Sequence, residues 1–537
     1  MTEEKSEIAR ETISQAEKLA GLAFTAPERK LMREGLAKYL AGYEKLRAVE
    51  VENSVPPALF FDPRLPGMAF EREQKPFKMS QVPLPEVPSD LEDLAFYPVT
   101  HLGRLIRERQ VSATALTEMY LNRLKRYDPI LHCVVTLTED LARIQAKRAD
   151  EEIAAGRYRG PLHGIPWGAK DLLATRGIRT TWGATPYQDQ VLDIDATVVR
   201  RLEEAGAVLV AKLTMGALAW GDVWFGGQTR NPWNVEQGSS GSSAGPGAAT
   251  AAGLVGFSIG TETWGSIVSP STRCGVTGLR PTFGRVSRHG AMALSWSMDK
   301  IGPMCRSVED CALVFDAIYG PDGRDATVVD LPFNWDADVG VADLRVGYVK
   351  SAFEKEREDK ASGANDKRTL EVLNGLGAAL IPVELPDYPV EPLSLILDAE
   401  AATAFDELTR SDRDDLLVRQ AQDAWPNVFR RARLIPAVEY LRANRIRLLV
   451  MQAMAELMAS IDVYVVPSSD RHNLLLTNLT GHPAVVVPNG FDEKGAPTSI
   501  SFVGRLYGEA EALAVARAYQ EATGFHLEHP LMAVDAL

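Results

Sequence analysis

A serine- and glycine-rich stretch, residues 238–266, constrains this chain more than any other feature. Its sequence, GSSGSSAGPGAATAAGLVGFSIGTETWGS, passes from small polar residues into a small-residue helix candidate and then into an apolar strand candidate. A flexible linker of this composition would not run into sequence so apolar and compact. Small residues let backbones approach closely and leave amide N–H groups free to face a ligand. An anion nest or an oxyanion hole requires that arrangement.

Helical patterns alternate with short apolar runs from about residue 91 onward. Helix candidates begin at Val111-Ser112 and at Thr197, and residues 399–459 are mostly helical. The strand candidates are 207–212, 256–261, 344–350, 461–467, 483–488 and 499–504. Strands that alternate with helices predict an α/β fold with a largely parallel sheet covered on both faces.

The amino-terminal region has a different texture. Apolar residues at helical spacing predict two helices within residues 1–48, and Thr25 and Glu28 predict a capping box at the start of the second. Residues 51–90 carry eight prolines, which cannot continue helices or central strands. We therefore expect a helical arm with a proline-rich linker at 1–90, packed on the main domain or on a second protein chain, and a catalytic domain at 91–537.

Composition excludes several classes of function. The formal net charge of −14 repels phosphate backbones, so nucleic acid is a poor partner. The four cysteines form no CxxC pair, which suits a reducing compartment. The charged amino terminus lacks the apolar run of a secretory signal, and no stretch approaches the ~20 apolar residues of a membrane span. We expect a cytoplasmic protein without membrane association, metal or cofactor.

Two short serine motifs offer alternative chemistry. GSSAG (241–245) matches the GxSxG nucleophile elbow, but that elbow needs a strand directly before it, and the preceding TRNPWNVEQGSS is loop-like. SMDK (297–300) matches the SxxK of penicillin-recognising enzymes, but no SDN or KTG follows. No P-loop and no GxGxxG after a strand are present, so the sequence gives a nucleotide site no support.

Several segments together resemble one family. The stretch GSSGSSAG…GLVGFSIGTETWGSIVSPSTRCGVTGLRPT is similar to the amidase signature, and PLHGIPWGAKDLLATRGIRTTWG (161–183) resembles that family's GxPxxxKD segment. TRNPWN (229–234) and the closing segment 478–513 also fit, so the resemblance runs from about residue 91 to the carboxyl terminus. It implies the amidase signature fold, a large twisted mixed sheet, mostly parallel, with helices on both faces.

The resemblance also implies a catalytic triad. Ser266 stands where the family has its nucleophile, and Lys170 stands where it has its base. Ser239, after Gly238, is predicted to follow a cis peptide bond and to relay a proton between them. The chemistry is coherent by itself, because a serine hydroxyl needs a base and a buried lysine can be neutral. Lys212 also follows an apolar run and is a rival base, although a structural role at a strand end is the simpler interpretation.

Further site residues follow from the same resemblance. Backbone N–H groups of Thr263, Trp264, Gly265 and Ser266 are expected to form the oxyanion hole. The predicted supporting or pocket residues are Gly238, Ser240, Met215 and Trp264, and Ser240 and Ser243 are candidates to hydrogen-bond the triad or to cap the next helix. Five tryptophans near the site favour an apolar or aryl substrate if they are not simply core: Trp167, Trp182, Trp220, Trp224 and Trp264.

The signature also departs from the usual pattern. Trp264 replaces a glycine, Ser242 replaces another, and Val268 and Glu262 replace the usual arginine and aspartate, so we expect the local ion pair between those two positions to be absent, with Arg273 as a substitute. Between the predicted serine pair at Ser239 and the nucleophile there are three more residues than in the common pattern.

The sequence thus predicts a hydrolase that cleaves C–N bonds of carboxamides, with chemistry that extends to esters, carbamates and aryl amides. One alternative is a glutamine-hydrolysing A subunit of a tRNA-dependent amidotransferase, which works with a second protein chain. Another is a non-catalytic binding protein on the same fold. The expected ligand is a small amide-like molecule, and the arm would allow a homodimer.

Overall fold

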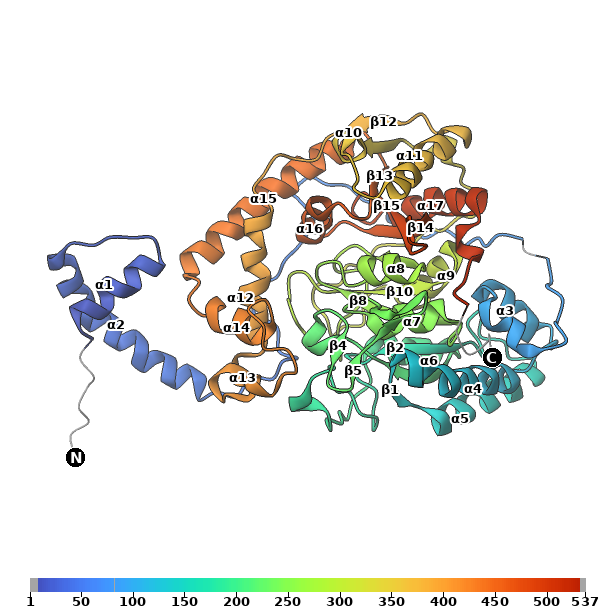
Figure 1. Ribbon diagram of the computed structural model, residues 1–537, viewed down its shortest axis with the longest axis horizontal. Coiled ribbons are helices and arrows are strands. Elements are labelled where there is room, and N and C mark those ends of the chain that lie inside the picture. The colour runs from blue at the N-terminus through green and yellow to red at the C-terminus, as the bar shows by residue number, and fades with distance from the viewer. Residues whose placement is uncertain (1–7, 82, 532–537) are drawn as a thin grey trace.

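The computed structural model describes residues 8–81 and 83–531, and an eleven-stranded sheet forms its centre (Figure 1). The strand order is β1-β3-β2-β8-β10-β9-β14-β15-β13-β11-β12. The bounds are β1 Val134–Leu137, β2 Pro166–Lys170, β3 Val208–Leu213, β8 Phe257–Glu262, β9 Thr277–Arg280, β10 Lys300–Cys305, β11 Val346–Val349, β12 Ile381–Val383, β13 Val463–Pro467, β14 Ala484–Phe491 and β15 Pro497–Gly504. Two small ribbons pair β4 (Val223–Trp224) with β5 (Gly227–Gln228) and β6 (Arg230–Asn231) with β7 (Asn234–Gly238).

The sheet is mixed, as predicted, but parallel pairing is confined to two groups. β2 is parallel to β3 and β8, and β11 is parallel to β12 and β13. The other adjacent pairs of this sheet in the described chain are antiparallel. The parallel share is lower than the alternation of helices and strands predicts. The reason is visible at β14 and β15, which a short turn joins directly as a hairpin, so no crossover helix is needed.

Every residue of the central strands β2, β3, β8 and β10 is buried. A strand buried on both faces needs a layer on each side of the sheet. Helices supply those layers, so the predicted α/β fold with helix-covered faces is confirmed. The helices that pack on strands include α4 Ala113–Leu131, α5 Glu139–Ala154, α7 Ala244–Ala251, α8 Val268–Cys274, α9 Val308–Ile318, α11 Lys360–Gly375 and α17 Glu509–Thr523.

The remaining helices extend this body. They are α3 Val99–Arg107, α6 Thr197–Glu204, α10 Lys350–Glu354, α12 Leu395–Ala404, α13 Asp406–Arg410, α14 Trp425–Ala432, α15 Ala437–Ala459 and α16 Arg471–Thr480. Short 3-10 turns lie at Leu91–Phe96, Thr185–Tyr187, Ala217–Ala219, Val341–Asp343, Glu391–Ser394, Arg413–Leu416 and Phe525–Leu527. The predicted helix start at Ser112 is confirmed, because the Ser112 hydroxyl accepts the Ala115 N–H and caps α4.

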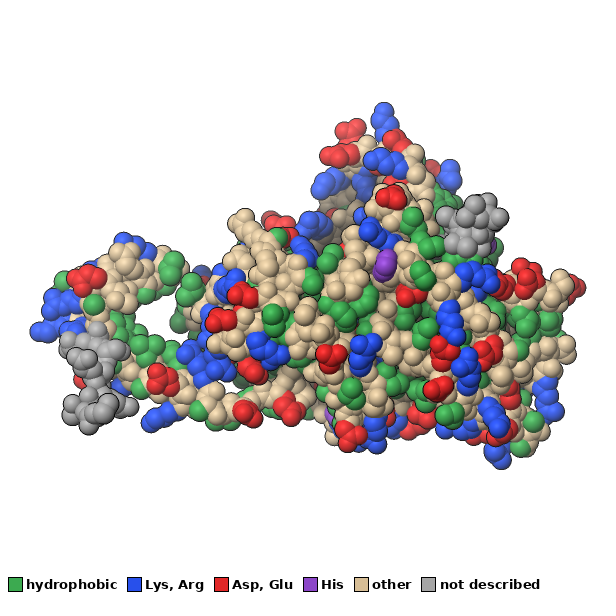
Figure 2. All heavy atoms as spheres, turned by 60° about the horizontal axis from the view of Figure 1, so that its bottom comes forward, with side chains coloured by type: hydrophobic (Ala, Val, Ile, Leu, Met, Phe, Trp, Pro, Cys, Tyr) green, Lys and Arg blue, Asp and Glu red, His purple; other side chains and the backbone are tan. Residues whose placement is uncertain are grey.

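The amino-terminal arm consists of α1 (Arg10–Leu19) and α2 (Ala26–Arg47), and it projects from the body (Figures 1 and 2). The predicted capping box is present: Thr25 and Glu28 exchange side-chain and backbone hydrogen bonds at the start of α2. Residues 1–7 of the predicted first helical segment lie outside the described residues. Beyond the arm, the Asn53 amide binds both backbone groups of Ala293, with N···O distances of 2.9 and 2.8 Å. These hydrogen bonds attach the linker to the body at Ala293.

Neither positive nor negative charge dominates the face of the molecule that Figure 2 displays. Figure 2 shows acidic and basic side chains interspersed over it, which is how a chain of net charge −14 avoids a large field of one sign there. Among the described residues, no helix combines the length and the apolar character that crossing a bilayer requires.

Candidate active site

Lys170 lies at the carboxyl end of β2 with its side chain fully buried. Its Nζ lies 2.8 Å from Ser242 Oγ, 3.0 Å from Ser243 Oγ, 2.8 Å from Thr261 Oγ1 and 3.3 Å from the Thr261 carbonyl oxygen. The neighbouring strand β8 supplies Thr261, and the serines lie just before α7. The sheet and the glycine-serine loop therefore meet at this amine.

Burial lowers the pKa of Lys170 well below its usual value, while the charges of Asp299 and Glu262 partly oppose that shift. Among the ion pairs of the described residues, none within 4 Å involves Lys170, whose partners are hydroxyl and carbonyl groups. Desolvation disfavours an ammonium, and no adjacent carboxylate restores it. Lys170 is therefore suited to act as a neutral base.

The rival base Lys212, one strand away on β3, has a different environment. Its Nζ lies 3.1 Å from Asp171 Oδ1 and 2.8 Å from Thr180 Oγ1, and both charged side chains of the pair are fully buried. Burial lowers the pKa of Lys212 too, but the Asp171 carboxylate opposes that change. The contacts of Lys212 thus support the structural role that the sequence favoured.

The predicted relay serine, Ser239, does not meet Lys170. Its hydroxyl donates to the Ser240 carbonyl at 3.0 Å, and the cis peptide bond joins Gly241 to Ser242 instead. The Ser239 assignment is wrong by three residues, because GSSGSS contains two consecutive GSS triplets and the second one reaches the lysine. The sequence did contain a signal for this register. The interval from Ser239 to Ser266 is three residues longer than in the common pattern, whereas the interval from Ser242 to Ser266 has the usual length.

Close backbone packing fixes Ser242. A Cβ on Gly241 would lie 1.8 Å from the Gly221 carbonyl oxygen, and a Cβ on Gly245 would lie 2.4 Å from the Thr214 amide nitrogen. Only glycine permits these approaches, which place the loop between the 216–222 segment and the first turn of α7. The predicted role of small residues is thus visible in the packing.

Ser266, the predicted nucleophile, lies between β8 and α8 and is 8% exposed. Its carbonyl oxygen accepts the Ser243 N–H at 3.2 Å, which joins the Ser266 backbone to the loop that contacts Lys170. Gly265 has φ +83°, a conformation that favours glycine. The structure therefore brings Lys170, Ser242 and Ser266 into one constellation.

The segment predicted to form the oxyanion hole, Thr263–Ser266, follows β8 directly. The Thr263 hydroxyl donates to Asp299 Oδ1 at 2.5 Å, and Trp264 is half-buried. A Cβ on Gly265 would lie 3.0 Å from Leu474 Cδ2, so α16 packs against the segment. Its role in binding an oxyanion stays a prediction.

The expected loss of the local ion pair is only partly right. Glu262 does not pair with a residue at 268; it pairs with Arg280 from β9 at 2.8 Å, and both side chains are fully buried. The Glu262 carboxylate also accepts the N–H groups of Ile267 and Val268, and its pKa is lowered to about 2 although burial opposes the shift. Arg273, the expected substitute, instead binds Gln237 at 3.0 Å.

The other predicted site residues surround this constellation. Met215 is buried, and the Ser240 N–H donates to Asp222 Oδ2 at 3.0 Å rather than to Ser242 or Ser266. A Cβ on Gly238 would clash with the same carboxylate. Of the five tryptophans, Trp167, Trp182 and Trp224 are buried core residues, whereas Trp220 and Trp264 are only partly buried.

The SMDK motif is not arranged for catalysis. Ser297 Oγ lies 2.8 Å from Glu400 Oε1, and Lys300 Nζ donates to the Met298 carbonyl. Among the described residues, no cluster of three or more metal-ligating side chains is present.

Comparison with known proteins identifies the family. The amidase family model matches residues 115–513. The A subunit of the glutamyl-tRNA(Gln) amidotransferase of Geobacter metallireducens is 33% identical over 469 residues, which cover 79% of this chain and 96% of that protein. The native peptide amidase of Stenotrophomonas maltophilia superposes with a TM-score of 0.73 at 28% identity, covering 82% of this chain and 100% of that one. The A subunit of the Thermotoga maritima amidotransferase gives a TM-score of 0.67 at 26% identity, with 80% and 95% covered. The chain belongs to the amidase family, whose members hydrolyse amides.

Proposed function

We propose that this chain hydrolyses carboxamides through an acyl-enzyme on Ser266, with Ser242 as the proton relay and Lys170 as the base. The observation that carries the proposal is the buried Lys170 amine, 2.8 Å from Ser242 Oγ and surrounded by hydroxyls rather than carboxylates. Burial lowers the pKa of Lys170 and so favours its neutral, basic form, and a serine beside it can pass on a proton.

The reaction then has two halves. Neutral Lys170 accepts the Ser242 proton while Ser242 takes the proton of Ser266, whose oxygen attacks the amide carbonyl. The oxyanion that forms is stabilised by the N–H groups of the Thr263–Ser266 segment. Protons return from Lys170 through Ser242 to the leaving nitrogen, which departs as the amine. Water, deprotonated by the same relay, releases the acid and restores Ser266.

One substrate assignment is the amide of glutamine, with the chain as the A subunit of an amidotransferase. It is supported by curated relatives that bear this name and are covered almost end to end, 96% of the Geobacter protein and 98% of the Heliobacterium modesticaldum protein. Under this assignment the chain delivers ammonia to a second protein chain.

The other assignment is a stand-alone amidase, as for the solved peptide amidase. The arm supports it, because α1 and α2 precede the region 115–513 that the family model matches. The partly buried Trp220 and Trp264 support an apolar or aryl substituent on the substrate, and esters and carbamates can use the same acyl-enzyme chemistry. The relatives weigh toward the glutamine assignment, and the arm weighs toward this one.

A fluorophosphonate probe tests the shared chemistry. We expect one adduct, on Ser266, mapped by peptide mass spectrometry, and its loss in Lys170→Ala and Ser266→Ala. An adduct on Ser243 or Ser297, or full hydrolysis of amides by Ser266→Ala, would contradict the proposal.

Substrate panels then separate the two assignments. Steady glutaminase activity that rises when a co-purifying protein is added supports the amidotransferase assignment. Turnover of aryl amides or peptide amides by the isolated chain, without glutaminase activity, supports the stand-alone amidase.

A further inference from the structure

The loop of residues 294–299 lies beside the predicted oxyanion segment. β8 and β10 are antiparallel with Glu262 opposite Lys300, so the next pair beyond the ladder is Thr263 opposite Asp299. The Thr263 hydroxyl closes this pair by donating to Asp299 Oδ1 at 2.5 Å. The contact lies at the first residue of the segment that leads to Ser266.

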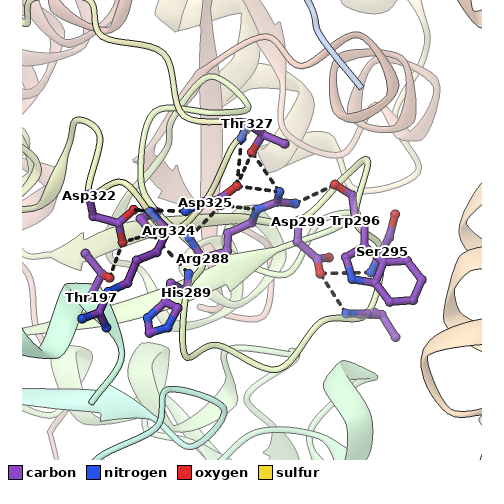
Figure 3. Close-up of polar contacts among 12 residues, drawn as sticks. Thr197, Arg288, His289, Ser295, Trp296, Asp299, Asp322, Arg324, Asp325 and Thr327 are labelled. Carbon is purple, nitrogen blue, oxygen red and sulfur yellow. Dashed lines mark hydrogen bonds and ion pairs between the residues drawn. The ribbon is translucent and has the colours of Figure 1, made fainter. Parts of the chain in front are cut away.

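The second oxygen of Asp299 organises its own loop. Oδ2 accepts the N–H groups of Leu294 at 2.8 Å and Ser295 at 3.0 Å, and Figure 3 shows Asp299 beside Ser295. The Arg288 guanidinium donates to the Trp296 carbonyl at 2.6 Å from the other side (Figure 3). With Thr263, the two loop N–H groups give the carboxylate three donors, and it cannot turn away from Thr263 without losing them.

Glu400 of α12 anchors the same loop to the helical part of the body. Its carboxylate accepts the Ser295 hydroxyl at 2.6 Å and the N–H and hydroxyl of Ser297 at 3.0 and 2.8 Å. Tyr440 of α15 donates to it at 3.0 Å. Because these donors fix the loop independently of Thr263, Asp299 is set in place before any substrate binds.

Asp299 also acts on Lys170 by its charge. Thr261 and Thr263 are two residues apart, so their side chains share a face if the extended backbone continues, and Thr261 contacts Lys170 while Thr263 contacts Asp299. Two carboxylates raise the pKa of Lys170 against the effect of burial. Asp299 has the larger effect, and Glu262 has the smaller one and is itself paired with Arg280. Burial raises the pKa of Asp299 itself, while its three hydrogen-bond donors and Arg288 oppose that change.

We infer that Asp299 is a positioning residue for the reaction: its carboxylate holds the Thr263–Ser266 segment through the hydrogen bond from Thr263, and its charge acts on the proposed base Lys170. The inference rests on the proposed function, because it needs a neutral Lys170 and an oxyanion held by that segment. It goes beyond that function by assigning two separable effects to one carboxylate outside the triad.

Two variants separate the effects. Asp299→Asn removes the charge, and its amide cannot serve Thr263 and both loop N–H groups equally well. We expect kcat to fall by about 10- to 100-fold with little change in KM, because small misplacements of catalytic groups have effects of this order. The acid limb of the kcat/KM profile should also move to lower pH, because Lys170 loses an anion that favours its ammonium. Thr263→Val keeps the charge, so kcat should fall while the limb stays.

Thr263→Ser and Asp310→Asn are the matched controls. Thr263→Ser keeps the hydroxyl and should restore kcat to within about 3-fold of the wild type. Asp310 is another buried carboxylate, accepting the N–H groups of Val99 and Thr100 at the start of α3, so Asp310→Asn makes the same chemical change away from Lys170. It should leave the acid limb unmoved.

An Asp299→Asn protein whose acid limb coincides with that of the wild type overturns the electrostatic half of the inference. Equal kcat values for Thr263→Val and Thr263→Ser overturn the positioning half, even if Asp299→Asn fails to fold. Failure of the proposed function is a different result, in which Ser266→Ala or Lys170→Ala keeps hydrolysing amides.

Discussion

The two serines of the glycine-serine loop should respond very differently to the same substitution. Ser239 and Ser242 are both buried, at 0% and 1% exposure, so replacing either by alanine removes one buried hydroxyl. The hydroxyl of Ser242 contacts Lys170, and in the proposed mechanism its loss interrupts proton transfer in both directions. Such a step is worth about 100- to 10,000-fold in rate, so we expect kcat of Ser242→Ala to fall by roughly 1,000-fold, or about 4 kcal/mol in activation free energy.

Among the described residues, the hydroxyl of Ser239 makes one hydrogen bond, which it donates to the Ser240 carbonyl. A neutral hydrogen bond of this kind contributes about 0.5–1.5 kcal/mol to folding, so Ser239→Ala should lower stability by that amount and change kcat by less than about 3-fold.

Steady-state hydrolysis of a chromogenic amide measures kcat, and urea denaturation measures the free energy of unfolding. The rate of fluorophosphonate labelling reports on Ser266 without requiring the natural substrate. The reasoning is refuted if Ser239→Ala loses as much activity as Ser242→Ala. It is refuted equally if Ser242→Ala stays within about 10-fold of the wild type while Lys170→Ala is inactive.

Three further predictions concern stability. Lys212→Met leaves the buried Asp171 charge unpaired and should cost about 3–5 kcal/mol of unfolding free energy in urea, whereas the double variant with Asp171→Asn should recover part of that loss. Gly241→Ala forces a Cβ to within 1.8 Å of a backbone oxygen and should abolish activity and cooperative unfolding, whereas Gly375→Ala, in a helix with open space around it, should be neutral or raise stability by up to about 1 kcal/mol. The pKa of Glu262 is lowered from 4.5 to about 2, so the stabilisation that its carboxylate provides is present above pH 4.5 and is lost as the pH falls. The difference in unfolding free energy between the wild type and Glu262→Gln should therefore shrink as the pH is lowered from 4.5 toward 2. A difference that stays constant over this range would contradict the assignment.

The sequence predicted the elements that local chemistry determines. The capping box at Thr25 and Glu28 and the cap at Ser112 both formed, because a cap needs only residues three positions apart. The apolar runs at 256–261 and 483–488 became strands of the central sheet. Strand direction was less predictable, because it depends on which connections cross the sheet and which turn back directly.

The sequence motifs predicted the candidate site, but they placed the relay serine at Ser239, three residues before the serine that contacts Lys170. Lys170 and Ser266 sit in unambiguous motifs, whereas the relay had two equivalent candidates three residues apart. Spatial proximity separates these two, because the Ser242 hydroxyl contacts the lysine amine whereas the Ser239 hydroxyl donates to the Ser240 carbonyl. The Glu262–Arg280 pair was missed for the same reason: β9 brings the arginine across the sheet from 18 residues away in the chain, and no local spacing indicates it.

The attachment of the linker at Asn53 changes what counts as the catalytic unit. Asn53 lies outside the region matched by the family model, yet it binds Ala293, whose neighbour Leu294 donates to Asp299. A truncation designed from the matched region alone would remove this amide, and with it one contact of the loop whose Asp299 binds Thr263 at the start of the predicted oxyanion segment. A sequence comparison restricted to residues 115–513 would also overlook the effect of a substitution at residue 53. For this chain, the contacts that reach the candidate active site therefore begin at residue 53, before the region 115–513 that the family model matches.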